Sequence, residues 1–196
     1  VLMHFPSSPS AWFVPSDCTR AGMDATTCRQ ETWKALSELR RRGIVRHVGV
    51  SNFAISHLQD VAAVPNGAPI ANNQIQYSPF APAAVHEIVA YCHAHNITVT
   101  AYSPLGGLRD QEKAAATQAL QYIADAYGVS VQQVMLRWAL QKNVAVIPGT
   151  GNPEHMKENL AVYDFTLTEV DMQAIDGLQF TAEREKFLFM DINSFA

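Results

Sequence analysis

Residues able to do acid–base or binding chemistry follow directly after short apolar runs of the chain. Five such positions occur in order: His4, Ser51 with Asn52, Gln74, Tyr102 with Ser103, and residues 149–152. An imidazole can move a proton, and hydroxyl and carboxamide groups suit a ligand that offers both donors and acceptors. In parallel β/α folds the carboxyl ends of the strands lie at one face, where the loops converge. The order therefore predicts one composite pocket at that face.

The five apolar runs are the strands that would position these residues. They lie near residues 1–4, 47–50, 73–77, 97–102 and 144–148. Helical patterns alternate with the runs, and this alternation predicts a parallel sheet with helical crossovers. We expect the strands to be parallel and adjacent in sequence order.

Start and stop signals delimit the helices between the strands. Thr27, with Gln30 three residues later, has the spacing of a capping box, and Gly43 ends that helix. Three later helices begin after polar caps, namely Ser130, Asn152 and Thr168. The helix after the last of these is expected over residues 169–178. The aromatic-rich tail of residues 180–196 is too apolar for a solvated segment, so we expect it to dock on the fold.

The chain is short for a closed barrel of this type. A (β/α)8 barrel has eight strands and about 250 residues, whereas this chain has 196 residues and five expected strands. We expect one domain over residues 1–196, the C-terminal part of a (β/α)8 TIM barrel with about five of its eight parallel strands. Because the chain begins with Val1 inside an apolar segment, we place the missing strands upstream. The inward faces of residues 1–3 and 144–147 would then lack partners.

Composition excludes several classes of partner. The chain has 14 Lys and Arg residues against 18 Asp and Glu, a net charge of −4, and no basic face for nucleic acid. Arg40, Arg41 and Arg42 fall at an expected helix end, where the macrodipole favours cations. No apolar run approaches the roughly 20 residues that cross a bilayer. We expect a cytoplasmic protein or a soluble one in an organelle, with any upstream targeting sequence outside these residues.

The three cysteines give no sign of a metal site or a cross-linked framework. Cys18, Cys28 and Cys92 have neither metal-ligand spacing nor an even number. They predict no bound metal and a compartment without structural disulfides. Cys92 falls on an apolar helical face and is expected in the core.

Five segments together resemble the aldo-keto reductase family. They are LMHFP at residues 2–6, GIVRHVGVSNF at 43–53, NQIQYSP at 73–79, AYSPLG at 101–106, and IPGT at 147–150 followed by Asn159 and Leu160. These segments are similar to the ends of the fourth to eighth strands of that family's barrel, in the same order. The resemblance implies an NADP(H)-dependent carbonyl oxidoreductase with a small carbonyl substrate.

The resemblance also implies a role for each matching residue. His4 would be the catalytic residue that orients the substrate carbonyl and supports proton transfer. Ser51, Asn52 and Gln74 would bind the nicotinamide carboxamide, and Tyr102 would stack on the nicotinamide ring. Two further groups of residues would bind the rest of NADP: Ser103 and Leu105 along the pyrophosphate, and Gly149, Thr150, Asn152, Glu158 and Asn159 around the adenosine 2′-phosphate and adenine.

The last segment departs from the commonest family pattern. Many members have a Lys where this chain has Gly149, and an Arg where it has His155. Both would supply positive charge to the 2′-phosphate. The N-terminus of the helix after Asn152 can still attract an anion. The expected preference for NADP over NAD therefore rests on fewer positive charges than in many family members.

The family's Tyr, Lys and Asp, which make the proton donor competent, match nothing in these 196 residues. General acid catalysis contributes roughly two to four powers of ten in rate, so we expect the chain alone to be inactive. Two interpretations follow. The first is a C-terminal portion of a carbonyl reductase. The second is a catalytically inactive subunit, structural or regulatory, whose open barrel edge is covered by another protein chain.

Overall fold

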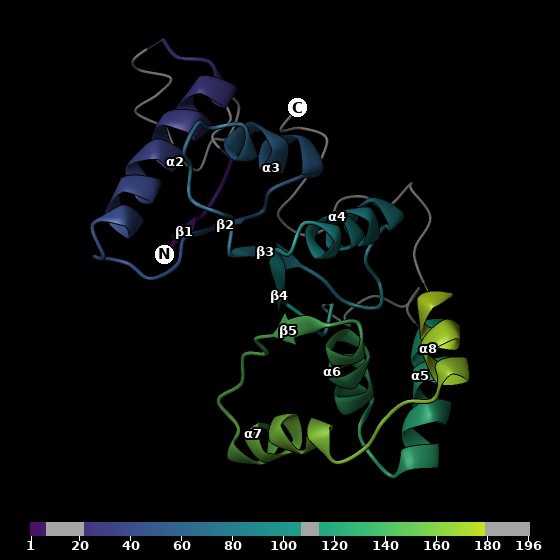
Figure 1. Ribbon diagram of the computed structural model, residues 1–196. Coiled ribbons are helices and arrows are strands. Elements are labelled where there is room, and N and C mark those ends of the chain that lie inside the picture. The colour runs from purple at the N-terminus through teal and green to yellow at the C-terminus, as the bar shows by residue number, and fades with distance from the viewer. Residues whose placement is uncertain (7–21, 107–113, 179–196) are drawn as a thin grey trace. The chain divides into compact units, whose positions relative to one another are not determined.

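The computed structural model describes residues 1–6, 22–106 and 114–178 (Figure 1). The chain divides into two compact units. The first contains Val1–Ile75 and Ile88–Thr98, and the second contains Gln76–Glu87 and Val99–Glu185. The tail that we expected to dock lies outside the described residues.

Five strands form one sheet in the sequence order β1-β2-β3-β4-β5. Their bounds are β1 Leu2–Met3, β2 Gly49–Ser51, β3 Asn72–Gln76, β4 Thr98–Tyr102 and β5 Val144–Val146. Parallel pairing joins β1 to β2, β2 to β3, and β4 to β5. The N–H of Thr98 donates to the carbonyl of Ala71, and the N–H of Tyr77 donates to that of Tyr102. The predicted order and parallel direction are confirmed, although β1, β2 and β5 are shorter than expected.

Seven α-helices and one 3₁₀ helix are described between and after the strands. Their bounds are α2 Ala25–Arg41, α3 Ile55–Ala62, α4 Ala83–Ala94, α5 Ala114–Tyr127, α6 Val131–Gln141, α7 Pro153–Leu160, η2 Ala161–Tyr163 and α8 Glu169–Asp176. Alternation of helix and strand makes this an α/β fold, as the sequence predicts. The last helix ends at Asp176, two residues earlier than expected.

The start of α2 corrects one sequence prediction. Asp24 is the N-cap, and its carboxylate accepts hydrogen bonds from the N–H of Thr27 at 2.9 Å and the hydroxyl of Thr27 at 2.6 Å. Thr27 is therefore inside the first turn and is not the cap. The predicted end is confirmed, because Gly43 has φ +72 and the N–H of Ile44 donates to the carbonyl of Leu39. This is the bonding pattern of a Schellman motif.

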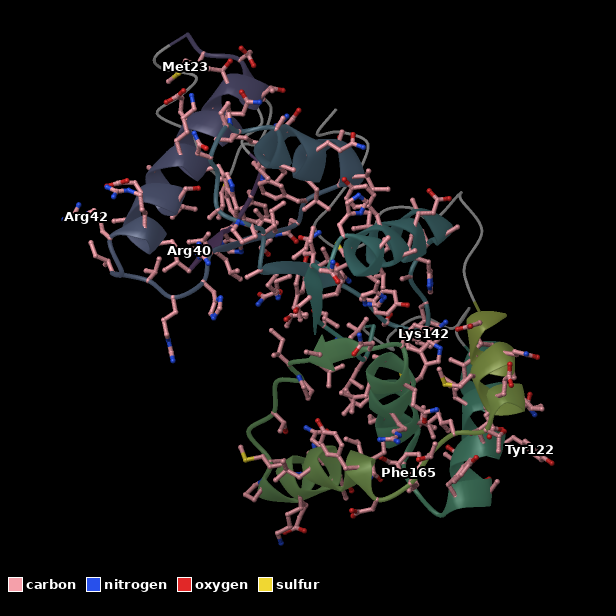
Figure 2. All side chains as sticks on the ribbon, viewed as in Figure 1. Met23, Arg40, Arg42, Tyr122, Lys142 and Phe165 are labelled. Carbon is pink, nitrogen blue, oxygen red and sulfur yellow. The ribbon has the colours of Figure 1, made fainter. Side chains whose placement is uncertain are left out.

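The core of the first unit lies between its strands and helices α2 to α4. Trp33, Phe53 and Leu58 are fully buried there. The indole N–H of Trp33 donates to the carbonyl of Ala68 at 3.2 Å, which satisfies its one polar atom. The side chains of Arg40 and Arg42 extend from the end of α2, as Figure 2 shows, so the basic cluster is solvated as predicted.

A polar network within the core of the second unit joins α6 to α8. Trp138 of α6 is fully buried, and its indole N–H donates to Asp176 at 2.8 Å. The ammonium of Lys142 lies 2.7 Å from the other carboxylate oxygen of Asp176. Tyr77 stacks on Trp138 with ring centroids 5.1 Å apart. The caps that begin these helices, Ser130 and Thr168, are confirmed, and both form complete capping boxes.

Three further expectations can be compared with the described residues. Cys28 is disulfide-bonded, which contradicts the expectation of no structural disulfide, whereas Cys92 is a free core thiol as predicted. In the last strand, Val144 pairs with the buried Val99 of β4 and is 1% exposed, whereas Ala145, on the opposite face of the strand, is exposed. Val1 and Ile147 are 62% and 49% exposed. The helices of the described segments include none long and apolar enough to cross a membrane.

Candidate functional site

The junction between β2 and α3 brings predicted site residues of the first unit together. Ser51 and Asn52 are 1% and 2% exposed. The hydroxyl of Ser51 donates to the carbonyl of Gln74 at 2.8 Å, and the N–H of Asn52 donates to the same oxygen at 2.9 Å. The register places Ser51 beside Gln74. One carbonyl of β3 therefore fixes two consecutive residues at the end of β2.

Asn52 also connects the junction to the end of β1. Its side-chain N–H donates to the carbonyl of His4 at 3.0 Å. Its backbone has φ +65, in the left-handed region that Asn tolerates better than most residues. The imidazole of His4 is exposed and stacks on Phe5 with ring centroids 4.4 Å apart. The ends of β1, β2 and β3 thus place His4, Ser51, Asn52 and Gln74 in one neighbourhood.

The side chain of Gln74 differs from that of its neighbour Asn73. Successive side chains of a strand point to opposite faces, and Asn73 is buried against Phe53 and Cys92 on the helix side. Gln74 is half-buried on the other face. Within the described residues, its carboxamide makes no hydrogen bond. A carboxamide with both donor and acceptor available therefore stands beside the hydroxyl of Ser51.

In the second unit, the turn after β4 carries the next predicted residues. Ser103 has φ +46, and its carbonyl accepts the N–H of Gly106 at 3.0 Å. A Cβ on Gly106 would lie 2.7 Å from the hydroxyl of Ser78 and 2.8 Å from a ring carbon of Phe80. Only glycine permits this approach, because φ at Gly106 is +58 as well. Leu105, inside the turn, is half-buried.

The segment between β5 and α7 holds itself together by local bonds. The hydroxyl of Thr150 accepts the N–H of Asn152 at 3.1 Å and lies 3.5 Å from Nδ1 of His155. Asn152 caps α7 by accepting the N–H of Glu154 at 3.0 Å, which confirms the predicted helix start. A Cβ on Gly149 would meet nothing within 4 Å. A longer side chain at Gly149 therefore has room.

Helix α7 carries the last two predicted residues, Glu158 and Asn159. No residue of this helix is fully buried; Asn159 is half-buried and the others are exposed. The carbonyl of Glu158 accepts a hydrogen bond from the side chain of Gln133 in α6 at 3.1 Å. This bond ties the exposed helix to α6 while the carboxylate of Glu158 remains at the surface.

The structure thus groups four predicted residues in the first unit and places the others on three segments of the second. The shared pocket of His4, Asn52 and Gln74 with Tyr102 stays a prediction. Sequence reasoning missed Asn73, whose carboxamide contacts the backbone at the β2–α3 junction. The sequence carries no signal that separates Asn73 from its polar neighbours Asn72 and Gln74.

The described tyrosines with a shifted pKa are not prepared as proton donors. Burial raises the pKa of Tyr102 to about 12. Burial, with a smaller contribution from the charge of Asp176, raises the pKa of Tyr77. The hydrogen bond to Asp171 raises the pKa of Tyr127. A raised pKa makes a phenol a weaker acid near neutral pH, so none of these three resembles a tuned catalytic acid.

A parallel sheet with polar residues at the carboxyl ends of its strands is typical of β/α-barrel enzymes. The family model described as Aldo/keto reductase family matches residues 2–179. The chain belongs to this family of oxidoreductases.

Individual relatives agree with this assignment. The chain is 37% identical over 159 residues to bovine aldo-keto reductase family 1 member A1, covering 78% of this chain and 48% of the relative. It is 38% identical over 151 residues to the oxidoreductase YtbE of Bacillus subtilis, covering 76% and 51%. A crystal structure of an aldo/keto reductase from Brucella melitensis superposes with a TM-score of 0.71 at 32% identity, covering 90% of this chain and 59% of that one. The chain spans about half the length of the curated relatives it matches.

Proposed function

We propose that this chain supplies the NADP(H)-binding part of a reductase that acts on a small carbonyl compound. The observation that carries the proposal is the junction at the ends of β1, β2 and β3. There, the half-buried carboxamide of Gln74 lies beside Ser51 and Asn52, whose backbone and side chains are already fixed.

The donor set fits a nicotinamide carboxamide. Such a group offers one acceptor and two donor hydrogens, and a glutamine side chain offers the complementary set. Ser51 gives its hydroxyl proton to the carbonyl of Gln74, so toward a ligand its oxygen would act as a hydrogen-bond acceptor. Pre-formed hydrogen bonds reduce the ordering that binding requires. Ser51, Asn52 and Gln74 would therefore hold the nicotinamide end of the cofactor.

The remaining residues bind and orient. Tyr102, whose phenol stays neutral at physiological pH because its pKa is about 12, would offer its ring face to the nicotinamide. Ser103 and Leu105 would line the pyrophosphate, and residues 149–159 would bind the adenosine end. NADPH supplies hydride when bound. His4 would orient the substrate carbonyl, since its exposed imidazole can donate a hydrogen bond.

A binding experiment tests this proposal. NADPH is titrated calorimetrically into the full natural chain and into Gln74→Glu, in which the donor is lost and a negative charge is added. We expect Gln74→Glu to weaken NADPH binding by about tenfold or more. Gln173→Glu, at an exposed position of α8, is the control for added charge and should bind like the wild type. Equal affinities of wild type and Gln74→Glu would contradict the proposal.

We expect residues 1–196 by themselves to lack reductase activity. Residues 1–196 include no match to the family's Tyr, Lys and Asp, so we expect no reduction of nitrobenzaldehyde with NADPH by this stretch. Measurable turnover that His4→Ala abolishes would contradict this expectation, because another residue would then supply the proton.

The second candidate function is an inactive structural or regulatory subunit. It is favoured by the outer edge of β1, where Val1 and Leu2 are 62% and 37% exposed and the sheet has no further strand in the described chain. Large apolar side chains left in water forgo about 1.5–3 kcal/mol each. Residues 1–196 alone should then associate, with themselves or with a covering chain. A monodisperse monomer with a cooperative melt, seen by sedimentation and near-UV circular dichroism, would contradict this candidate.

A further inference from the structure

Asn73 is the most completely buried polar residue in the neighbourhood of the candidate site. Its exposed fraction is 0%, and it lies in β3 on the side that faces α3 and α4. A buried carboxamide destabilises a fold unless its donors and acceptor find partners. The partners of Asn73 therefore show what the residue does.

Both polar atoms of the Asn73 side chain bond the backbone of one residue. Its Nδ2 donates to the carbonyl of Phe53 at 2.9 Å, and its Oδ1 accepts the N–H of Phe53 at 3.4 Å. Nδ2 also lies 3.8 Å from Sγ of Cys92 in α4. The carboxamide of Asn73 thus forms two hydrogen bonds with the main chain of Phe53, and we call this pair of bonds the clamp.

The conformation of the preceding residue, Asn52, explains why Phe53 needs these two hydrogen bonds. Asn52 has φ +65, which turns the chain away from the strand direction of β2. The N–H and carbonyl of Phe53 consequently have no ladder partner in β3, and buried main-chain groups require one. The side chain of Asn73 takes the place of the missing strand partner.

Asn52 is therefore fixed on both sides. Its own N–H is held by the carbonyl of Gln74 at 2.9 Å, and the next residue is held by Asn73. Phe53 is fully buried and its ring meets His57 edge-on at 5.8 Å. With these restraints, the side chain of Asn52 keeps one direction relative to β3.

We propose that Asn73 is a positioning residue that sets the conformation of Asn52 for cofactor binding by clamping the main chain of Phe53. The proposal rests on the proposed function. It assigns Asn73 no contact with cofactor or substrate. The predicted consequence of losing the clamp is a looser Asn52 and weaker NADPH binding, in a protein that still folds.

The first test measures the clamp without any ligand. Hydrogen exchange is followed in peptides covering residues 50–55 of the full natural chain, in Asn73→Ala and in Cys92→Ala. Cys92→Ala removes a buried group from the same layer but leaves the clamp. We expect exchange at residues 52–53 to be roughly tenfold faster in Asn73→Ala and unchanged in Cys92→Ala. Equal exchange in Asn73→Ala and the wild type would overturn the proposal.

The second test uses Asn73→Asp, which keeps the size of the side chain. Burial raises the pKa of a carboxyl group, and the protonated acid has one donor and one acceptor for Phe53, as the carboxamide does. The nearby Cys92 stays neutral because burial raises its pKa to about 11. His57, which contacts Phe53, is common to all variants and cancels in the comparison with Asn73→Ala.

The expected result is a rescue by acid. Relative to wild type, Asn73→Asp should bind NADPH roughly tenfold more weakly at a pH of about 8 and recover most of that loss at about 5.5. Asn73→Ala should show the weaker binding at both pH values. Faster exchange with NADPH affinity within about twofold of wild type in both variants would overturn the positioning role. A wild-type chain that binds no NADPH would overturn the proposed function instead, while the exchange test still decides whether Asn73 fixes Asn52.

Discussion

The junction after β2 and the junction after β5 are built in opposite ways. After β2, buried side chains bond to main chain more than 20 positions away, as Ser51 does to Gln74 and Asn52 does to His4. After β5, the hydroxyl of Thr150 and the side chain of Asn152 bond groups within five positions, at the surface. The sheet therefore sets the proposed nicotinamide end, whereas local sequence sets the proposed phosphate end. Substitutions should change the second with little effect on the fold.

The largest effect should follow from valine at Asn52. A β-branched residue at φ +65 is strained by about 1–2 kcal/mol, and the hydrogen bond to His4 contributes about 1 kcal/mol more. We expect Asn52→Val to lower the free energy of unfolding by about 2–3 kcal/mol in urea titrations. Asn52→Gly, which accepts this φ, should lose only about 1 kcal/mol. Equal losses in the two variants would show that backbone conformation does not matter here.

Removing the hydroxyl of Ser51 should have the next largest effect. Ser51→Ala deletes one buried hydrogen bond, and the carbonyl of Gln74 keeps only the N–H of Asn52 as partner. The expected loss in the free energy of unfolding is about 1.5 kcal/mol, with NADPH binding weakened in parallel. Ser37→Ala also removes a hydroxyl that bonds main chain, but it is a less direct control for Ser51→Ala. It deletes two hydrogen bonds, one within α2 and one with Ala68. If Ser51→Ala kept the stability and the NADPH affinity of the wild type, the claim that the sheet positions the nicotinamide site would be contradicted.

The cap of α7 should matter less, because the helix is exposed and local. Asn152→Ala removes the bond to the N–H of Glu154 and should cost about 0.5–1 kcal/mol of stability. Asn152→Asp keeps the cap and should restore the loss. Circular dichroism melts of the two variants provide the comparison. A lower melting temperature for Asn152→Ala than for Asn52→Val would contradict the proposed contrast between the two junctions.

The smallest expected effect comes from adding charge after β5. Gly149→Lys places a cation where a Cβ has open space, so the fold should be unaffected. Because exposed charges interact through water and are screened by salt, the gain should be a few-fold in NADPH affinity over NADH, or about 0.5–1 kcal/mol. Gly149→Gln is the uncharged control. Calorimetry at low and high salt should show the preference shrinking as salt rises, and a preference unaffected by salt would contradict the charge argument.

Sequence patterns within a few residues predicted the helices and strands well. Contacts between residues far apart in the sequence were harder to predict. Ser130, Asn152 and Thr168 cap their helices as expected, because a cap depends on residues within one turn. Thr27 was mistaken for a cap because the true cap, Asp24, lies three residues earlier and its carboxylate accepts the N–H of Thr27. The order of the strands followed from alternation alone, and the resemblance supplied the site residues.

What the sequence could not show depends on contacts between distant segments. Asn73 is one of four polar residues in β3, and only its position opposite the left-handed Asn52 reveals that it bonds Phe53. The disulfide of Cys28 was missed because three cysteines at these spacings match no known framework. The exposure of His4, likewise, depends on which segments cover the end of β1.

The most direct test of the account is whether NADPH reaches the carboxamide of Gln74. The full natural chain is labelled with ¹⁵N in its glutamine side chains, and the Gln74 resonances are assigned by their loss in Gln74→Glu. On titration with NADPH, the account predicts a saturable shift of the Gln74 side-chain signals and no shift of those of Gln173, which is exposed on α8. Binding of NADPH detected by calorimetry with the Gln74 signals unmoved would contradict the assignment of this junction as the nicotinamide site.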